Sequence, residues 1–586
     1  MKKTIDLSPQ TITQNIQNLQ KFMQQHDLDG MYISSFDIYL NEYVPLADNH
    51  RFYLTGFTGS VAEALVPRTG KVHLYVDGRY HEQADSEVPL DVVHVVKCDA
   101  STGNHQALIQ DILQLKLKKV GLEAERCALS FFKRISSVSE VKPFQNGEVA
   151  QLIKKAAIEA PKEIKLVSRE HRGRDTLEKT RLAFTTDKEA MFIAALDQIA
   201  WVTNCRGYHL PFLSSFRAKA LATLKKVYVF IEHETPLHKS AEKIEGVEWI
   251  KVSASELKHE LEKIQNSLHL ESIQFDPAHL NCADFNTLMS VFHTDRLKEK
   301  PAGLIEWMSI KEPIEIKEME DNFRRSDKAI FNTMKWVKEK TKKGERFTEF
   351  DLWQETSNKY REQGAIDQSF NTIAGVGPNG SIIHYGNPSD ELAIKADDMI
   401  LLDSGGYYEG GFATDTTRTF FSSYKGSANP EYKKIYTLVL KGLLNCQYSV
   451  FPTGTKGNVL DGIARAPLFK HGYNYNHGTG HGVGVHVHED GVRLSMISQM
   501  PMKEGQVVSI EPGIYIPGFA GVRLENVAVV EKHPTLKGML RFRSLTNVGF
   551  DPELIDDSLM NSEEMAQLKE YELECAKRGN SLMTLA

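Results

Sequence analysis

The 586-residue sequence predicts a mixed α/β protein, with two α/β domains followed by a domain in which helices cover an antiparallel sheet. The chain is too long for a single core. Short β-rich runs alternate with amphipathic helices in two consecutive stretches of similar size. After about residue 312, long helices alternate instead with strand pairs that have no crossover helix between them. We therefore expect domains over residues 1–157, 158–310 and 311–586, the last with a C-terminal tail from about residue 545.

The two N-terminal domains show the same kind of alternation. In the first, ITQNIQNLQKFMQQH has helical spacing, and MYIS, AEALV and KVHLYV are short strand candidates. In the second, EAMFIAALDQIAWVTN precedes the strand candidates KVYVFIE, VEWIKV and SIQFDP. No literal repeat links the two stretches, but their similar size suggests two related domains.

The third domain begins with a long predicted helix, KEMEDNFRRSDKAIFNTMKWVKEKT, and a second follows in NPEYKKIYTLVLKGLLNCQYSV. The second helix keeps Tyr432, Ile435, Tyr436 and Val439 on one face, the spacing of a helix packed on a sheet. The strand pairs between the helices predict antiparallel pairing. GVGPNG at 375–380 matches a dinucleotide-binding fingerprint, but its proline and the strand-like SIIHYG after it favour a hairpin turn.

Composition restricts the function classes. Hydrophobic residues make up 41% and charged residues 25%, and the net charge of −7 comes without a dense Lys/Arg block, so nucleic acid is not an expected partner. The N-terminus lacks the apolar run of a signal peptide, and no run of about 18 apolar residues predicts a membrane-spanning helix. Six widely spaced cysteines without a CxxC pair favour buried, reduced thiols in a cytoplasmic protein.

Four acidic residues stand at the ends of predicted strands. Asp403 ends an apolar run and Asp415 opens the return strand, while Glu511 ends QVVSIE and Glu525 lies in GVRLEN. Half-buried carboxylates need partners, and a cation between them would supply one. The alternatives are turn aspartates that cap backbone N–H groups, and an ion pair between Glu525 and Arg523, which lie two residues apart on one strand face.

The stretch NHGTGHGVGVHVHED carries four histidines, His477, His481, His486 and His488. Four carboxylates with one imidazole suit Mn²⁺, Fe²⁺ or Co²⁺ better than a structural zinc ion. Four negative charges also exceed the need of one divalent ion, which favours a two-metal centre with the ions roughly 3.5–4 Å apart. The sequence has no HExxH motif, which excludes the helix-borne zinc protease arrangement. The residues by themselves therefore indicate a metal-assisted hydrolase.

The motifs LLDSG…TDTTRTF, HGTGHGVG…VHED, SIEPGIY and GVRLEN, in this order, resemble those of the pita-bread metallopeptidases. Within that group the chain resembles the long, three-domain aminopeptidase P (Xaa-Pro aminopeptidase) family. RFYLTGFTGS and YVDGRYHEQA are similar to that family's N-terminal domain, and ALDQIAWVTNCRG to its middle one. The resemblance implies two creatinase-N-terminal-like domains and a catalytic domain with a curved antiparallel sheet. The tail YELECAKRGNSLMTLA departs from the family pattern, so no role is implied for it.

The resemblance also implies a set of metal ligands. Asp403 would bind one metal, while His481 and Glu511 would bind the other. Asp415 and Glu525 would bridge both. Glu511 would double as the general base on the bridging water. Mn²⁺ is the expected ion, with Co²⁺, Zn²⁺ and Fe²⁺ as alternatives.

Five further roles follow from the resemblance. His384, in SIIHYG, would contact substrate and help to move protons, and His488 would steady the tetrahedral intermediate. Arg523 would orient ligand carboxylates, Tyr515 would line the pocket, and His477 would lie in the pocket or behind the first metal.

The implied function is a cytoplasmic, homodimeric metalloaminopeptidase that removes the first residue from short peptides with proline in the second position. A hydroxide activated by two metals would attack the scissile carbonyl. The first alternative is an Xaa-Pro dipeptidase (prolidase), which usually has a single N-terminal domain. The second is a non-catalytic pita-bread binding module, a class that loses the metal ligands.

Overall fold

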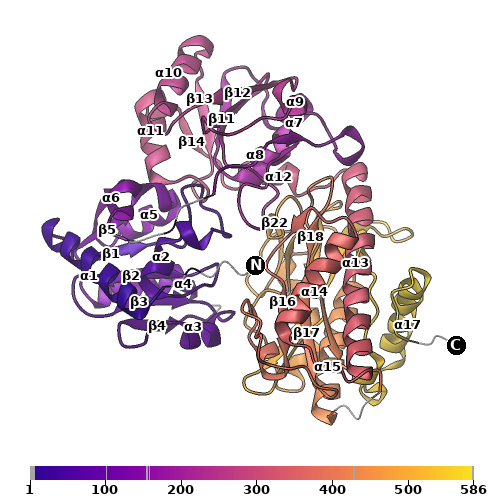
Figure 1. Cartoon of the computed structure of the whole chain (residues 1–586). Helices are drawn as coiled ribbons and strands as arrows, with labels where there is room; N and C mark the ends of the chain where they lie inside the picture. Colours follow the sequence, from indigo (N-terminus) through magenta and orange to yellow (C-terminus); the bar gives the residue numbers. More distant parts are fainter. Residues whose placement is uncertain are drawn as a thin grey trace. The chain divides into compact units, whose positions relative to one another are not determined.

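The computed structural model describes residues 5, 7–99, 102–153, 156, 159–425 and 429–583 (Figure 1). The expected boundary between residues 157 and 158 lies outside the described residues. The chain forms two compact units: residues 1–166 with 174–305, and residues 167–173 with 306–586.

The first unit holds two six-stranded sheets with the same strand order, β4-β3-β2-β1-β5-β6 and β12-β11-β10-β8-β13-β14. In each sheet the second strand along the chain pairs antiparallel with the first and the third, and the other three pairings are parallel. The first sheet contains β1 (Gly30–Ile33), β2 (Glu63–Pro67), β3 (Val72–Val76), β4 (Val93–Lys97), β5 (Lys119–Glu123) and β6 (Glu140–Phe144). The second contains β8 (Glu189–Ile193), β10 (Lys219–Thr223), β11 (Val227–Ile231), β12 (Val247–Lys251), β13 (Ser272–Phe275) and β14 (Leu297–Glu299). This shared topology agrees with two related α/β domains.

Helix α1 (Pro9–Gln25) shows how the sequence builds this unit. The Ser8 side chain accepts a hydrogen bond from the Thr11 amide at 3.2 Å and caps the helix start, where proline occupies the first turn. Ile12 and Leu19 lie on the predicted apolar face and are buried in the core of the first sheet. The other helices of eight or more residues described in the unit are α4 (Gly103–Gln114), α5 (Leu129–Ser136), α7 (Thr176–Ala183), α8 (Leu196–Thr203), α10 (Leu257–Leu268) and α11 (Cys282–Phe292).

The second unit contains a three-stranded sheet, β16-β17-β19, and a six-stranded sheet, β20-β27-β26-β23-β21-β22. All pairings in both sheets are antiparallel, which confirms the prediction. The strands of the first are β16 (Ile373–Val376), β17 (Met399–Ser404) and β19 (Thr416–Phe421). Those of the second are β20 (Val450–Pro452), β21 (Gly480–Gly482), β22 (Glu489–Leu494), β23 (Val507–Ile510), β26 (Asn526–Lys532) and β27 (Met539–Ser544).

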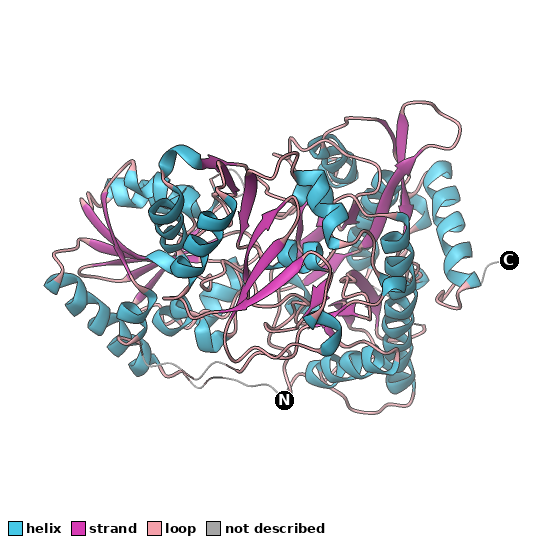
Figure 2. Ribbon diagram, turned by 90° about the horizontal axis from the view of Figure 1, so that it is seen from above, coloured by secondary structure: helices cyan, strands magenta, loops and turns pink. Residues whose placement is uncertain are grey.

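Helices cover these sheets (Figures 1 and 2). Two of them, α13 (Pro313–Lys342) and α14 (Glu349–Glu362), share a core with the three-stranded sheet. The others, α15 (Pro430–Gln447), α16 (Gly457–Phe469) and α17 (Ser562–Lys577), share a core with the six-stranded sheet. The two long helices predicted from amphipathic spacing are therefore confirmed as α13 and α15.

Two local predictions are wrong. The hairpin turn expected at 375–380 is a short 3₁₀ turn (Gly377–Ser381) after β16, and SIIHYG forms no strand. The turn packs tightly on β25 (Ala520–Arg523), since a Cβ atom on Gly521 would lie 1.8 Å from the Gly380 carbonyl oxygen. The single strand expected through Arg523 and Glu525 is interrupted, because β25 ends at Arg523 and β26 begins at Asn526.

The six cysteines all lie in described parts of the chain and are buried with free thiols, as predicted. Among the described residues, no helix combines the length and apolar character needed to cross a membrane.

Candidate metal centre

The candidate ligands come from strands or strand ends of the second unit. Asp403 lies near the end of β17, and Asp415 directly precedes β19. His481 is the middle residue of β21, Glu511 directly follows β23, and Glu525 lies between β25 and β26. Because Asp403 pairs with Thr417, two residues after Asp415, the alternation of side chains turns both aspartates to one face of the sheet.

Three of these side chains converge closely. One ligand atom each of Asp415, His481 and Glu525 lies within 4.8 Å of the others. His481 Nε2 is 3.5 Å from Asp415 Oδ2 and 3.3 Å from Glu511 Oε1. The histidine thus lies between two carboxylates.

The imidazole of His481 is oriented as a metal ligand would be. Its Nδ1 lies 3.1 Å from the Gly482 carbonyl oxygen, which can only accept, so Nδ1 carries the proton in the neutral ring. The lone pair on Nε2 then faces carboxylate oxygens, an arrangement that a cation between them would make favourable. A backbone carbonyl that holds the far nitrogen is a common support for metal-binding histidine.

Among the candidate ligands that the structure describes, two carboxylate oxygens have no hydrogen-bond partner although they are buried. They are Asp403 Oδ1 and Glu525 Oε1. The other oxygen of each is held, since Asp403 Oδ2 accepts from Arg523 and Glu525 Oε2 accepts from Thr417 Oγ1 at 2.9 Å. Buried oxygens without donors are costly unless a cation binds them, so this donor set fits divalent metal ions.

The carboxylates oppose one another's ionisation. Burial, followed by the charge of Glu525, raises the pKa of Asp415 well above its usual range. Burial and the charge of Glu511 do the same to the pKa of Glu525. The pKa of Glu511 is raised to about 7 by burial, while the Arg523 charge acts in the opposite direction. A cluster of this kind holds protons at neutral pH unless cations displace them.

Arg523 connects the carboxylates to the surrounding pocket. Its guanidinium donates to Asp403 Oδ2 at 2.7 Å, to Tyr515 OH at 2.8 Å and to Thr417 Oγ1 at 3.1 Å. A partner considered from the sequence was Glu525; the structure puts Asp403 in direct contact with the guanidinium. Arg523 Nη2 also donates to the Ile383 carbonyl at 3.3 Å, which brings the backbone beside His384 to the centre.

The other predicted pocket residues lie around this core. His477 Nε2 is 2.9 Å from Tyr515 OH, and its Nδ1 is 2.7 Å from the Gly478 carbonyl oxygen. The rings of His481 and His488 meet edge to face with centroids 4.4 Å apart. His477 is thus joined to Arg523 through Tyr515, and His488 lies against the candidate ligand.

Three supporting residues were not predicted from the sequence: Thr417, Arg418 and Tyr571. Thr417 contacts both Glu525 and Arg523, and Arg418 donates to the Glu525 carbonyl at 2.6 Å and to Tyr571 OH on α17 at 2.8 Å. Thr417 could have been found in TDTTRTF, because it shares the strand face of Asp415 by the period of two. The bond from Arg418 to the tail helix had no signal in the sequence.

A buried ion pair supports the loop of His488 as well. Lys311 and Glu489 are in contact, and each side chain is 2% exposed. Glu489 also accepts a hydrogen bond from the Val485 amide at 3.2 Å. Since Glu489 follows His488 directly, the pair fixes the strand end that carries this histidine.

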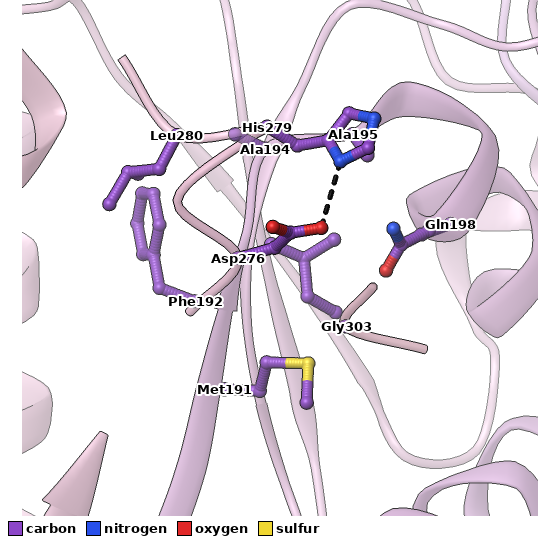
Figure 3. A pocket seen from close by; sticks show the side chains of 10 residues that line it. Met191, Phe192, Ala194, Ala195, Gln198, Asp276, His279, Leu280 and Gly303 are labelled. Carbon is purple, nitrogen blue, oxygen red and sulfur yellow. Dashed lines mark hydrogen bonds and ion pairs between the residues drawn. The ribbon is translucent and has the colours of Figure 1, made fainter. Parts of the chain in front are cut away.

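A separate pocket in the first unit is a poor candidate for a peptide site (Figure 3). Its volume of about 10 Å³ is the room of a single water molecule. His279 Nδ1 lies 2.9 Å from Asp276 Oδ2, and Asp276 also accepts from the amides of Ala278 and Ala302, each at 3.0 Å. These bonds make the Asp276–His279 pair a structural one.

Family models match nearly the whole chain. The model described as Metallopeptidase family M24 matches residues 317–532. Two models described as Creatinase/Prolidase N-terminal domain match residues 15–153 and 155–315. The expected fold class, two creatinase-type α/β domains followed by a pita-bread domain, is thereby confirmed.

Relatives of similar length span most of the chain. A probable Xaa-Pro aminopeptidase P of Laccaria bicolor is 29% identical, with 97% of this chain and 91% of the relative covered. Aminopeptidase P2 of Arabidopsis thaliana is 29% identical, with 95% and 84% covered.

Solved structures show the same fold. The X-prolyl aminopeptidase of Caenorhabditis elegans, described as a cytosolic enzyme with a di-nuclear active site, superposes with a TM-score of 0.88 at 23% identity. That match covers 97% of this chain and 96% of the other. The Xaa-Pro dipeptidase of Bacillus anthracis superposes with a TM-score of 0.53 at 24% identity, over 64% of this chain and 98% of its own.

Proposed function

We propose that the chain is a metallopeptidase of family M24 and an Xaa-Pro aminopeptidase, which removes the first residue of peptides with proline in the second position. The observation that carries the reaction class is the convergence of Asp415, His481 and Glu525, with Asp403 and Glu511 beside them. The relatives that span the chain and are named probable Xaa-Pro aminopeptidase P support the substrate class.

The proposed ligands divide between two divalent ions. Asp403 would hold one ion, His481 and Glu511 would hold the other, and Asp415 and Glu525 would be shared by both. The oxygen-rich donor set with one imidazole favours Mn²⁺, with Co²⁺, Zn²⁺ and Fe²⁺ as alternatives. Two bound ions would supply a Lewis acid for the scissile carbonyl and lower the pKa of the attacking water.

The chain's own side chains then handle protons and orientation. Glu511, whose Oε1 lies 3.3 Å from His481 Nε2, would accept a proton from the attacking water. His384 exchanges protons with the substrate, and His488 donates to the oxygen of the tetrahedral intermediate. The hydrogen-bonded row of Arg523, Tyr515 and His477 forms a polar wall for the peptide.

Proline in the second position fits a site of this kind. The bond before proline is a tertiary amide without an N–H group, so recognition cannot depend on that donor. A free substrate amine that binds an acidic group or a metal restricts cleavage to the first residue. We also propose that the protein is cytoplasmic and that it forms a homodimer. Sedimentation analysis of the pure protein would test the homodimer.

Two alternatives are less well supported. The Bacillus anthracis dipeptidase is covered almost completely by a match to only 64% of this chain, so about a third of this chain has no counterpart in it. A non-catalytic binding module is disfavoured because the buried carboxylates and His481 are all present in one cluster.

A substrate comparison tests the proposal. The Mn²⁺-loaded protein is incubated with an Arg-Pro-Pro tripeptide, an Arg-Pro dipeptide and an Arg-Ala-Pro control, and products are identified by mass spectrometry. We expect release of arginine from Arg-Pro-Pro and no cleavage of the control. Turnover of the dipeptide alone would assign the chain to the dipeptidases.

A further inference from the structure

Glu349, the first residue of α14, binds a single segment of the chain through four partners. Its side chain is fully buried, at 0% exposure. Oε1 accepts from the Val376 amide at 2.9 Å and from Asn379 Nδ2 at 3.0 Å. Oε2 accepts from Tyr385 OH at 2.8 Å and from the Ser389 amide at 3.0 Å. All four donors lie between residues 376 and 389, the segment that carries His384.

This carboxylate is stabilised by neutral donors. In the described part of the chain, no lysine or arginine forms an ion pair with Glu349, so hydrogen bonds and the positive end of α14 balance its charge. A buried carboxylate with four donors has little freedom to move. It therefore fixes the segment on both sides of His384.

The opposite side of the segment is held by the candidate centre. Arg523 Nη2 donates to the Ile383 carbonyl at 3.3 Å, and the Gly380 backbone packs against Gly521 too closely for any side chain. His384 thus lies between a residue bound by Arg523 and Tyr385, which is bound by Glu349. The segment is clamped between α14 and β25.

We propose that Glu349 is a positioning residue that sets the location of His384 for proton transfer to the substrate. The proposal rests on the proposed function, since it takes His384 as the residue that acts on the substrate. Glu349 itself stands behind the segment and does not touch the peptide. A displacement of His384 by about 1 Å is enough to lower turnover about 100-fold without removing any catalytic group.

Glu349→Gln tests the idea because it places an NH₂ group where one pair of donors now points. We expect kcat on an Xaa-Pro-Yaa peptide to fall about 10- to 100-fold, with KM within about twofold and an unchanged metal content. His384→Ala should lower kcat by about 10²-fold or more. In the double variant Glu349→Gln/His384→Ala, the first change should cost less than about twofold, since nothing remains to be positioned.

The controls separate positioning from loss of structure. Glu362→Gln, on the exposed side of the same helix, should leave kcat unchanged. If Glu349→Gln does not fold, Tyr385→Phe serves instead, because it removes only one of the four donors to Glu349. We expect Tyr385→Phe to lower kcat by less than the 10- to 100-fold expected for Glu349→Gln. Disappearance of that loss in the His384→Ala background supports the proposal. Equal losses in the presence and absence of His384, or no loss in Glu349→Gln, would overturn it. Full turnover in His384→Ala alone would refute the role proposed for His384. That result would leave the proposed metal-dependent cleavage unaffected, since the substrate comparison tests it independently.

Discussion

The guanidinium of Arg523 donates to Asp403 Oδ2 at 2.7 Å, so a buried cation already neutralises part of the carboxylate cluster. Both side chains are largely buried, at 2% and 11% exposure. Among the described residues, no lysine or arginine forms an ion pair with the other carboxylates of the cluster. In the metal-free protein, Arg523 is therefore the cation that compensates the charge of the cluster. In the metal-loaded protein, the metal ions add further positive charge.

Replacement of Arg523 by methionine tests this difference. In the protein stripped with EDTA, the loss should lower the free energy of unfolding by about 3–5 kcal/mol, because it leaves a buried carboxylate uncompensated. In the Mn²⁺-loaded protein the same replacement should lower the free energy of unfolding by less, because the metal ions also neutralise the carboxylates. Thermal unfolding of both forms measures the difference, and equal losses would show that the cluster does not bind the metal.

Thr417→Val should weaken metal binding without a change in the fold, because valine has nearly the same size and shape as threonine. The threonine hydroxyl orients Glu525 and accepts from Arg523, and residues in such supporting positions change metal affinity about 10- to 100-fold. Isothermal titration with Mn²⁺ measures this. Thr419→Val is the matched control, since its hydroxyl contacts the Arg523 backbone and should leave the affinity unchanged. Equal affinities in the two variants would contradict the role of Thr417.

Metal binding should release protons and strengthen as the pH rises. Burial raises the pKa of Glu511 from 4.5 to about 7, and the pKa values of Asp415 and Glu525 lie well above their usual range. Between about pH 4.5 and 7 the folded, metal-free protein binds more protons than the unfolded chain, so its stability falls as the pH rises. Metal ions need the ionised carboxylates, so Mn²⁺ affinity changes in the opposite direction. Calorimetric titration in buffers of different ionisation enthalpy counts the released protons, and an affinity independent of pH from 5.5 to 7.5 would exclude this coupling.

Lys311→Met should destabilise the second unit strongly. Loss of the lysine leaves Glu489 charged and buried, at an expected cost of about 3–5 kcal/mol in the free energy of unfolding. Lys311→Met/Glu489→Gln removes both charges and should regain much of that loss. Denaturant unfolding of the wild type, of the single variants Lys311→Met and Glu489→Gln, and of the double variant provides the values. Additive effects of the two changes would show that the pair is not coupled.

The sequence predicted the elements better than their junctions. Amphipathic spacing identified α13 and α15, and the strand that ends at Asp403 was found from its apolar run. The turn before His384 was missed, because its shape depends on the approach of Gly380 to Gly521, about 140 residues later in the chain. Glu525 was placed within a strand because nothing local shows that pairing changes partner there.

For the candidate site, too, some residues could be predicted from the sequence and others could not. The resemblance of the motifs named the candidate carboxylates and the candidate histidine, and the structure places ligand atoms of Asp415, His481 and Glu525 within 4.8 Å of one another. The supporting contacts of Thr417, Glu349 and the Lys311–Glu489 pair depend on tertiary packing. From sequence alone, a lysine or glutamate is most simply interpreted as a solvated surface charge. Only the structure shows that these are buried.

A metal titration of the EDTA-treated protein tests whether the carboxylate cluster is a catalytic site for two metal ions. Mn²⁺ is added stepwise while bound metal is measured by elemental analysis and turnover by release of the first residue from an Xaa-Pro-Yaa peptide. We expect two ions per chain, turnover that returns with them, and loss of both tight binding and turnover in Asp415→Asn. Full turnover in the metal-free protein, or in Asp415→Asn, would contradict that expectation.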